Sequence, residues 1–176
     1  MIVAVGLTYG SLMTFLPLFG VERGIANVGL FFTAYGIMNA TGRIPLGRLS
    51  DRVGRKKVIV PAILVVALAV GGLNVTSSVG PLIIMACAYG LGYGGAWTAL
   101  MALVVDEAPL EVRGTALGVL YACLDLGIGL GGVVMGPVAG TVGYGGMYLL
   151  LGLIALAGVA VFVGLMGREP PQRRID

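Results

Sequence analysis

The sequence predicts an all-α membrane protein in which six transmembrane helices follow one another along the chain. Composition is the first reason: 58% of the 176 residues are hydrophobic and 11% are charged, with a mean hydropathy of +1.02, whereas soluble domains carry about 25% charged residues. The second reason is a series of apolar stretches long enough to cross a bilayer, which takes about 20 residues. The third is that the charges gather in short segments between these stretches.

The six helices are expected, in order, at residues 2–20, 27–47, 57–76, 81–104, 113–138 and 145–167. Pro81 suits the first turn of the fourth helix, and Gly167 followed by Pro170 ends the sixth. Residues 1–167 are therefore predicted to form one bundle, and residues 168–176 a cytoplasmic tail. The 31 glycines favour close packing of helices in lipid.

The distribution of Lys and Arg predicts the orientation. Six crossings place both termini on one side, and nearly all basic residues fall on that side: Arg48, Arg52, Arg55, Lys56, Lys57, Arg113, Arg168, Arg173 and Arg174, with Arg43 just inside. On the other side only Arg23 is found. Because basic residues resist translocation, both termini are expected in the cytoplasm of a multi-pass protein of a bacterial-type inner membrane.

The loop after the second helix has a specific order of residues. An excess of basic residues in cytoplasmic loops does not by itself explain this order. It reads GRLSDRVGRKK over residues 47–57, with Gly47, Asp51, Arg52, Gly54 and Arg55 at fixed spacing. This segment resembles the signature loop of the major facilitator superfamily, which follows the second helix of each six-helix half. The resemblance implies one half of that fold, a 3+3 repeat of helices.

The same loop is predicted to act as a conformational latch. Gly47 and Gly54 permit a tight turn between two antiparallel helices, and the Asp51 carboxylate suits the amide-rich start of a helix. Arg113 stands at the first turn of the fifth helix on the same face. We therefore expect Asp51 to pair with Arg113 and the neighbouring amides. In the family this loop stabilises the outward-open state.

The resemblance implies a secondary active transporter that moves a small solute by alternating access, with proton-coupled efflux by an antiporter as the expected mode. The segments "TFLPLF", "FFTAYGI" and "DLGIGLGG" resemble the C-terminal half of bacterial efflux-type members. The expected partners are the solute, the lipid bilayer and an N-terminal six-helix half, from the same gene or another chain, or a second copy in a homodimer. The alternative is a non-transporting membrane partner or a truncated orphan half.

Two helix faces are candidates for the substrate cavity. The fourth helix carries Tyr89, Tyr93 and Trp97 at a spacing of four, and the first helix carries Thr8, Ser11 and Thr14 on a common face. In the family, the first and fourth helices of each half line the central cavity, so the resemblance implies that these residues meet the substrate. The alternative for the aromatic stripe is simple helix packing.

Asp125 is the candidate for proton coupling. It lies about 18 Å from the start of the fifth helix, near the bilayer centre, where a carboxylate is costly and marks a functional site by default. The alternative is a protonated or hydrogen-bonded group that only fixes packing. Arg43 is a possible partner if side-chain reach and helix tilt cooperate.

Glycines form two further patterns in the fifth helix. Small or polar residues share one stripe, which is expected to pack on protein and not on lipid: Gly118, Tyr121, Asp125, Gly129, Gly132 and Gly136. The segment GVVMGPVAG over residues 132–140 resembles a sequence pattern of drug/proton antiporters. The last position of that pattern is a glycine, and this chain has Thr141 there. Alternatively, these glycines permit close packing and Pro137 ends the helix.

Composition also excludes several classes. The chain has no His, and no nucleophile and base stand at a recognisable spacing, so it is predicted not to be an enzyme and to have no catalytic residues. Cys87 and Cys123 fall inside apolar stretches and are not expected to form a disulfide. We expect no cofactor, no metal site and no nucleic-acid partner.

Overall fold

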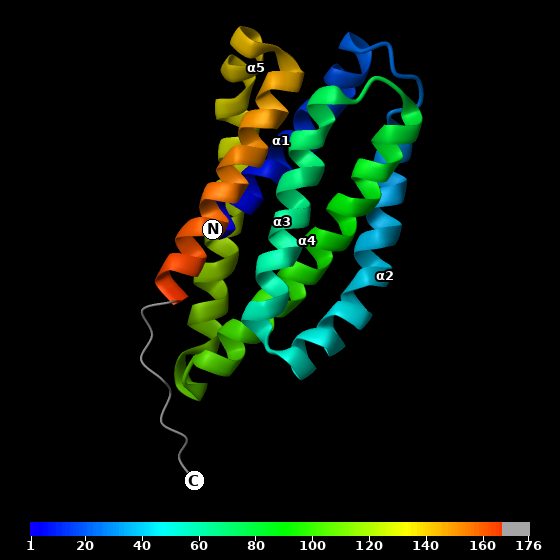
Figure 1. The fold of residues 1–176 in the computed structure, drawn as a ribbon. Helices are drawn as coiled ribbons and strands as arrows, with labels where there is room; N and C mark the ends of the chain where they lie inside the picture. Colours follow the sequence, from blue (N-terminus) through cyan, green and yellow to red (C-terminus); the bar gives the residue numbers. More distant parts are fainter. Residues whose placement is uncertain (167–176) are drawn as a thin grey trace.

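A computed structural model describes residues 1–166, and it is a bundle of long helices (Figure 1). The bundle begins with α1 (Ile2–Glu22), α2 (Gly29–Val53), α3 (Arg55–Gly72) and the short η1 (Leu73–Val75). It continues with α4 (Val79–Glu107), η2 (Leu110–Val112) and α5 (Arg113–Met166). The tail predicted at residues 168–176 lies outside the described residues.

The element α5 consists of two helical arms and not of one straight helix. At Gly143 the backbone leaves the helical region, with φ 73° and ψ 165°, and the chain reverses its direction there (Figure 1). A positive φ of this kind favours glycine, which has no Cβ. The first arm, residues 113–142, continues past Pro137, which lies inside the helix and does not end it.

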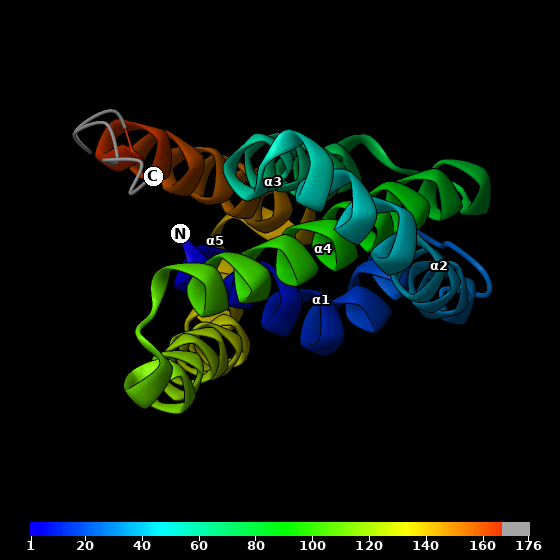
Figure 2. The same ribbon diagram turned by 90° about the horizontal axis from the view of Figure 1, so that it is seen from below.

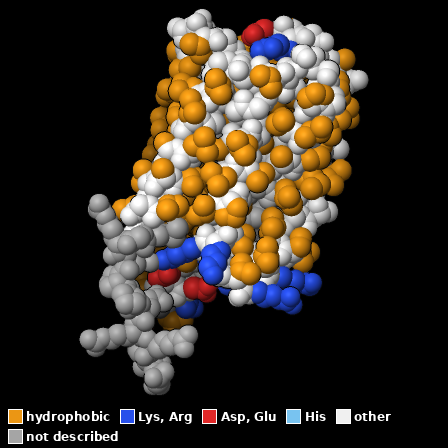
Figure 3. Space-filling view, in the orientation of Figure 1, with side chains coloured by type: hydrophobic (Ala, Val, Ile, Leu, Met, Phe, Trp, Pro, Cys, Tyr) orange, Lys and Arg blue, Asp and Glu red, His pale blue; other side chains and the backbone are white. Residues whose placement is uncertain are grey.

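Four helical stretches among the described residues are long and apolar enough to cross a membrane: Ile2–Glu22, Arg55–Val75, Val79–Glu107 and Leu110–Leu165. The last of these contains both arms of α5. The helix α2 is not among them because polar residues such as Asn39, Arg43 and Asp51 lower its hydropathy. Charged side chains gather at the two ends of the bundle, and hydrophobic side chains cover the face between them (Figure 3).

The turns alternate between the two ends of the bundle (Figure 1). The turn from α2 to α3 and the segment from α4 to α5 lie at one end, and the other connections lie at the opposite end. Seen along the bundle, α4 lies between α3 and α1 (Figure 2). The helix α1 packs mainly on α5, and α2 packs mainly on α4, while α3 contacts both α4 and α5.

Glycines set the closest of these helix contacts. On α5, a Cβ added to Gly127 would meet the carbonyl oxygen of Val3, and one added to Gly131 would lie 2.5 Å from that of Leu7. On α1, Gly6 and Gly10 face α5 backbone in the same way. Side chains at these positions would separate the helices, so α1 and α5 touch backbone to backbone, as small residues allow in membranes.

The contact between α2 and α4 has the same physical basis. A Cβ added to Gly90 would lie 2.5 Å from the carbonyl oxygen of Tyr35, and one added to Gly94 would lie 2.8 Å from that of Asn39. The α5 stripe predicted to pack on protein divides into two parts within this chain. A Cβ added to Gly132 or Gly136 would contact Thr14 or Phe15 of α1. Gly118 and Gly129 have open space where a side chain would be, and Tyr121 and Asp125 are exposed.

Replacing Gly127 with Ala is expected to destabilise the protein by about 1–3 kcal/mol, because the added methyl group overpacks the α1–α5 contact. Thermal unfolding of the purified protein in detergent measures the effect. Gly140→Ala, on the same arm, is the matched control, since that position has no neighbour within 4 Å. Both changes favour the helix equally, so equal melting temperatures for the two variants would contradict the packing explanation.

Candidate functional site

Four tyrosines from three helices form a cluster in the middle of the bundle. Tyr9 of α1 and Tyr35 of α2 meet Tyr89 and Tyr93 of α4, with ring centroids between 5.3 Å (Tyr9 to Tyr93) and 6.3 Å (Tyr35 to Tyr93) apart. These separations are favourable for aromatic pairs. We call these four residues the tyrosine cluster. It brings α1, α2 and α4 together at one place.

A polar ladder along α2 leads into this cluster. The Arg43 Nε donates a hydrogen bond to Asn39 Oδ1 at 2.9 Å, and Asn39 Nδ2 donates to the Tyr35 hydroxyl at 2.8 Å. The spacing of four residues places these groups on one face of the helix. Asn39 is buried, whereas Arg43 is exposed. The amide thus links an exposed guanidinium to a phenol of the cluster.

The hydroxyls predicted on the cavity face of α1 are placed differently from the expectation. Thr8 and Ser11 are fully buried and serve helix packing. Thr8 donates to the Val5 carbonyl at 2.7 Å and lies 3.1 Å from the Tyr89 hydroxyl, while Ser11 lies 3.2 Å from the Gly131 carbonyl. Thr8 therefore faces α4 and Ser11 faces α5. Thr14 is the exposed hydroxyl of the three.

The aromatic residues predicted on α4 divide into two groups. Tyr89 is 1% exposed and Tyr93 7%, so the first is a packing residue and the second shows only an edge. Trp97 is half-buried and packs edge-on against Tyr121 of α5, with ring centroids 5.1 Å apart. The Tyr121 hydroxyl lies 3.6 Å from the Met101 sulfur. The stripe therefore joins α4 to α2 at one level and to α5 at another.

Asp125 projects from the first arm of α5 on the exposed side. Within residues 1–166 its carboxylate makes no hydrogen bond or ion pair. Asp125 and Arg43 both lie close enough to Tyr93 to act electrostatically on its hydroxyl. The two opposite charges therefore flank the tyrosine cluster from different helices without pairing directly.

A second cluster of charges lies at the end of the bundle that carries the α2–α3 turn. Arg55 forms ion pairs with Asp51, one turn before it, and with Asp106 of α4, where Nε to Oδ2 is 3.0 Å. The Ser50 hydroxyl accepts a further hydrogen bond from Arg55 at 2.9 Å, and Lys56 reaches Glu107 at 3.9 Å. The start of α3 is thus fastened to the end of α4.

The predicted partner of Asp51 therefore needs correction. Asp51 pairs with Arg55 and not with Arg113, because the tight turn at Gly54 (φ 101°) brings Arg55 one helical turn away. The Arg113 Nε instead donates to the Ala108 carbonyl at 3.2 Å, at the end of α4. Gly47 packs near Thr98 of α4. Among the remaining members of the predicted latch, Arg52 is exposed and forms no ion pair within residues 1–166.

Sequence reasoning missed several of these groups. Tyr9 and Tyr35 lie on different helices from the aromatic stripe of α4. Only the crossing of α1, α2 and α4 shows that they belong to the tyrosine cluster. Asn39 shares a polar face of the second helix with Arg43 in the sequence, and a spacing of four is a usable signal for a hydrogen-bonded pair on a helix. Asp106 and Glu107 are 51 residues from their partners, so local spacing could not predict these pairs. Among the described residues no group of His, Cys, Asp and Glu could hold a metal ion.

Comparison with known proteins gives a consistent picture. The model of the Major Facilitator Superfamily matches residues 1–176. The staphylopine export protein of Staphylococcus aureus is 33% identical over 176 residues, which cover 98% of this chain and 44% of the relative. A multi-drug resistance efflux pump PmrA homolog of Lactococcus lactis is 31% identical over 160 residues, covering 87% and 39%. An uncharacterized MFS-type transporter of Salmonella typhimurium is 33% identical over 156 residues, covering 89% and 40%.

These matches confirm the resemblance that the GRLSDRVGRKK loop indicated. Together with the apolar helices they establish a multi-pass membrane protein. The chain spans about two fifths of the length of the curated relatives it matches.

Replacing Arg55 with Gln is expected to loosen the end of α4, because the guanidinium bridges carboxylates on two helices. Hydrogen exchange of amides 104–112 should become faster, while global stability changes by less than about 1 kcal/mol, as is usual for exposed ion pairs. Arg52→Gln removes a neighbouring charge without an ion pair and is the matched control. Equal exchange in the two variants would contradict the bridge.

Proposed function

The chain belongs to the major facilitator superfamily, and on that premise we propose that it is the C-terminal six-helix half of a secondary transporter that exports a small solute. Two relatives carry names that support export, the staphylopine export protein and the multi-drug resistance efflux pump homolog. The half is proposed to work by alternating access against a second half. The names of the relatives do not favour the alternative of an orphan half without transport.

The proposed half has six crossings arranged as a 3+3 repeat. The first three are α1, α2 and α3, and the second three are α4 and the two arms of α5. The alternating positions of the turns support this arrangement (Figure 1). The helix α2 crosses despite its polar residues because Asn39 is buried against α4 and hydrogen-bonded. Polar residues in such helices face protein or a water-filled cavity.

The solute is proposed to bind on the exposed side of the tyrosine cluster. The residues proposed to line it are the exposed Arg43, Asp125 and Thr14, the half-buried Tyr9, Tyr35 and Trp97, and the edge of Tyr93. Ligand sites combine apolar and aromatic walls with a few polar groups that fix orientation. Thr8, Ser11 and Tyr89 support this wall from behind, since they are buried.

The observation that carries the proton-coupling proposal is the exposed Asp125 carboxylate on an otherwise apolar helix. At about 18 Å from the start of α5 it lies deep in the membrane. A carboxylate there is a default functional site. Protonation would remove its charge from the cavity wall, and release of the proton would restore it. The absence of a fixed ionic partner within residues 1–166 leaves this carboxylate available for that cycle.

The charge cluster at the α2–α3 turn is proposed to act as the latch. Arg55, Asp51 and Asp106 join three helices at one end of the bundle. Charge-assisted hydrogen bonds of this kind are stronger than neutral ones, yet they lie in contact with water and can exchange partners. The latch would close this end in one state of the transporter and open in the other.

Asp125→Asn is expected to abolish pH-driven solute uptake in inside-out vesicles of the full-length transporter, because the amide cannot carry a proton. Facilitated exchange without a pH gradient should persist. Glu111→Gln, an exposed carboxylate just before α5, is the matched control and should keep both activities. Full pH-driven uptake by the Asp125→Asn protein would rule out the coupling role.

Orientation is tested by the labelling of single cysteines in intact cells, with Cys87 and Cys123 replaced by Ser. We propose that both termini are cytoplasmic. Ser78→Cys, between η1 and α4, should then react with a membrane-impermeant maleimide added outside. Val53→Cys, at the basic turn, should react only after the cells are opened. The reverse labelling pattern would overturn the orientation.

A further inference from the structure

An apolar groove of about 370 Å³ runs along the outside of α2, α3 and α4. Its lining consists of Leu46, Leu49, Val53, Lys57, Val58, Pro61, Ala62, Val65, Leu91 and Gly92. Its volume is in the range of ligand pockets, about 300–1,000 Å³. All but one of these residues are apolar or glycine, and the exception, Lys57, belongs to the turn end of α3.

The groove results from the way the three helices pack. The helices α2 and α3 each pack on α4 and only lightly on each other, so a gap between them stays open with α4 as its floor. Gly92 contributes no side chain to that floor, and a Cβ there would lie 2.7 Å from the Ala62 carbonyl oxygen. Pro61, inside α3, has no backbone N–H, so it donates no hydrogen bond to the carbonyl of Lys57 one turn before it.

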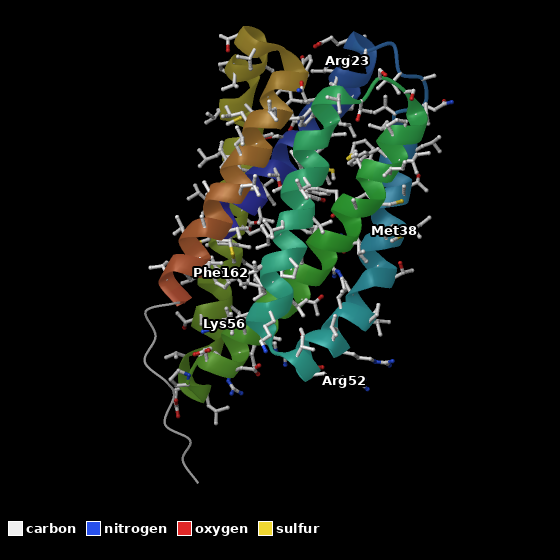
Figure 4. All side chains as sticks on the ribbon, in the orientation of Figure 1. Arg23, Met38, Arg52, Lys56 and Phe162 are labelled. Atoms are coloured by element: carbon white, nitrogen blue, oxygen red, sulfur yellow. The ribbon has the colours of Figure 1, made fainter. Side chains whose placement is uncertain are left out.

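The basic residues at this end of the bundle fall into two sets. Arg55 and Lys56 are neutralised by carboxylates of α2 and α4. Arg48, Arg52 and Lys57 are exposed and form no ion pair within residues 1–166. Arg52, at the end of α2, and Lys56, at the start of α3, lie at the same end of the bundle (Figure 4). Figure 3 shows blue side chains on both sides of an orange surface at this end.

We propose that this groove holds an acyl chain of an anionic phospholipid, whose phosphate is bound by Lys57 with Arg52. None of the four residues of the tyrosine cluster lines this groove, so this site is separate from the proposed solute site. Water in the groove would find almost no polar partner, whereas a lipid chain matches the apolar lining. Basic groups beside a groove between membrane helices attract anionic head groups, and a Lys side chain reaches the interface from its apolar stem.

Charge complementarity favours an anionic lipid over a neutral one and over a second copy of the chain. A second copy would bring the same basic surface toward Lys57, and like charges repel. A zwitterionic lipid would offer its phosphate together with a cation that the uncompensated bases disfavour. Val53 and Lys57 flank the tight turn at Gly54, so the bound lipid would contact both helices of that turn.

Native mass spectrometry of the full-length protein, delipidated in detergent and titrated with phosphatidylglycerol or phosphatidylethanolamine, tests the site. Lys57→Gln is expected to lower the preference for phosphatidylglycerol about fivefold, the effect of one basic group. Val65→Phe fills the groove and is expected to reduce the binding of both lipids. The matched controls are Arg23→Gln at the opposite end (Figure 4) and Leu68→Phe on α3, where the side chain is 67% exposed and outside the groove.

Three outcomes would overturn the proposal. The first is equal binding of both lipids by the wild-type protein, and the second is unchanged binding by Val65→Phe. The third is a change of oligomeric state in Val65→Phe with lipid binding unaltered, which would assign the groove to a second copy of the chain. The melting temperature of each variant checks that it folds. If an added ring alone lowers stability, Leu68→Phe loses stability as well, and lipid binding by Val65→Phe is compared with lipid binding by Leu68→Phe.

Discussion

Backbone-to-backbone contact between helices at glycine is the interaction on which the rest of this structure depends. In a bilayer, two helices gain little from burying apolar surface, because lipid is as apolar as the partner helix. Close van der Waals contact must hold them instead. Gly127 and Gly131 let α5 reach the α1 backbone, and Gly90 and Gly94 let α4 reach α2. Larger residues at these positions would move whole helices apart.

The same crossings decide where the polar groups lie. Gly94 leaves room for Asn39 against α4, and Asn39 in turn holds Arg43 by a hydrogen bond. On α5, Asp125 precedes Gly127 by two residues, which is about 200° around a helix. Since Gly127 faces α1, Asp125 must point to the opposite, open side. The positions of Arg43 and Asp125 thus depend on glycines at helix contacts.

The sequence was sufficient for the membrane class and the superfamily, because hydropathy and the loop motif are local properties. It was not sufficient for the rotation of each helix. The fifth helix has glycines on two faces, and periodicity could not tell which face meets α1. The same uncertainty turned Thr8 and Ser11 from expected cavity residues into buried ones. The partner of Arg55 on α4 depended on tertiary contact across 51 residues, which no local pattern encodes.

The exposed side of α5 supports the proposal that this chain works with a second half. Gly118 and Gly129 have no neighbour within 4 Å in this chain, and Asp125 lies between them on the same side. At the proposed depth of Asp125, a charged carboxylate facing lipid would cost about 2.5–3.5 kcal/mol on the translocon scale, so this side is unsuited to lipid. Glycines and a carboxylate together suit another helix bundle, which can approach closely and enclose water. The relatives, more than twice as long as this chain, have the length to supply such a bundle.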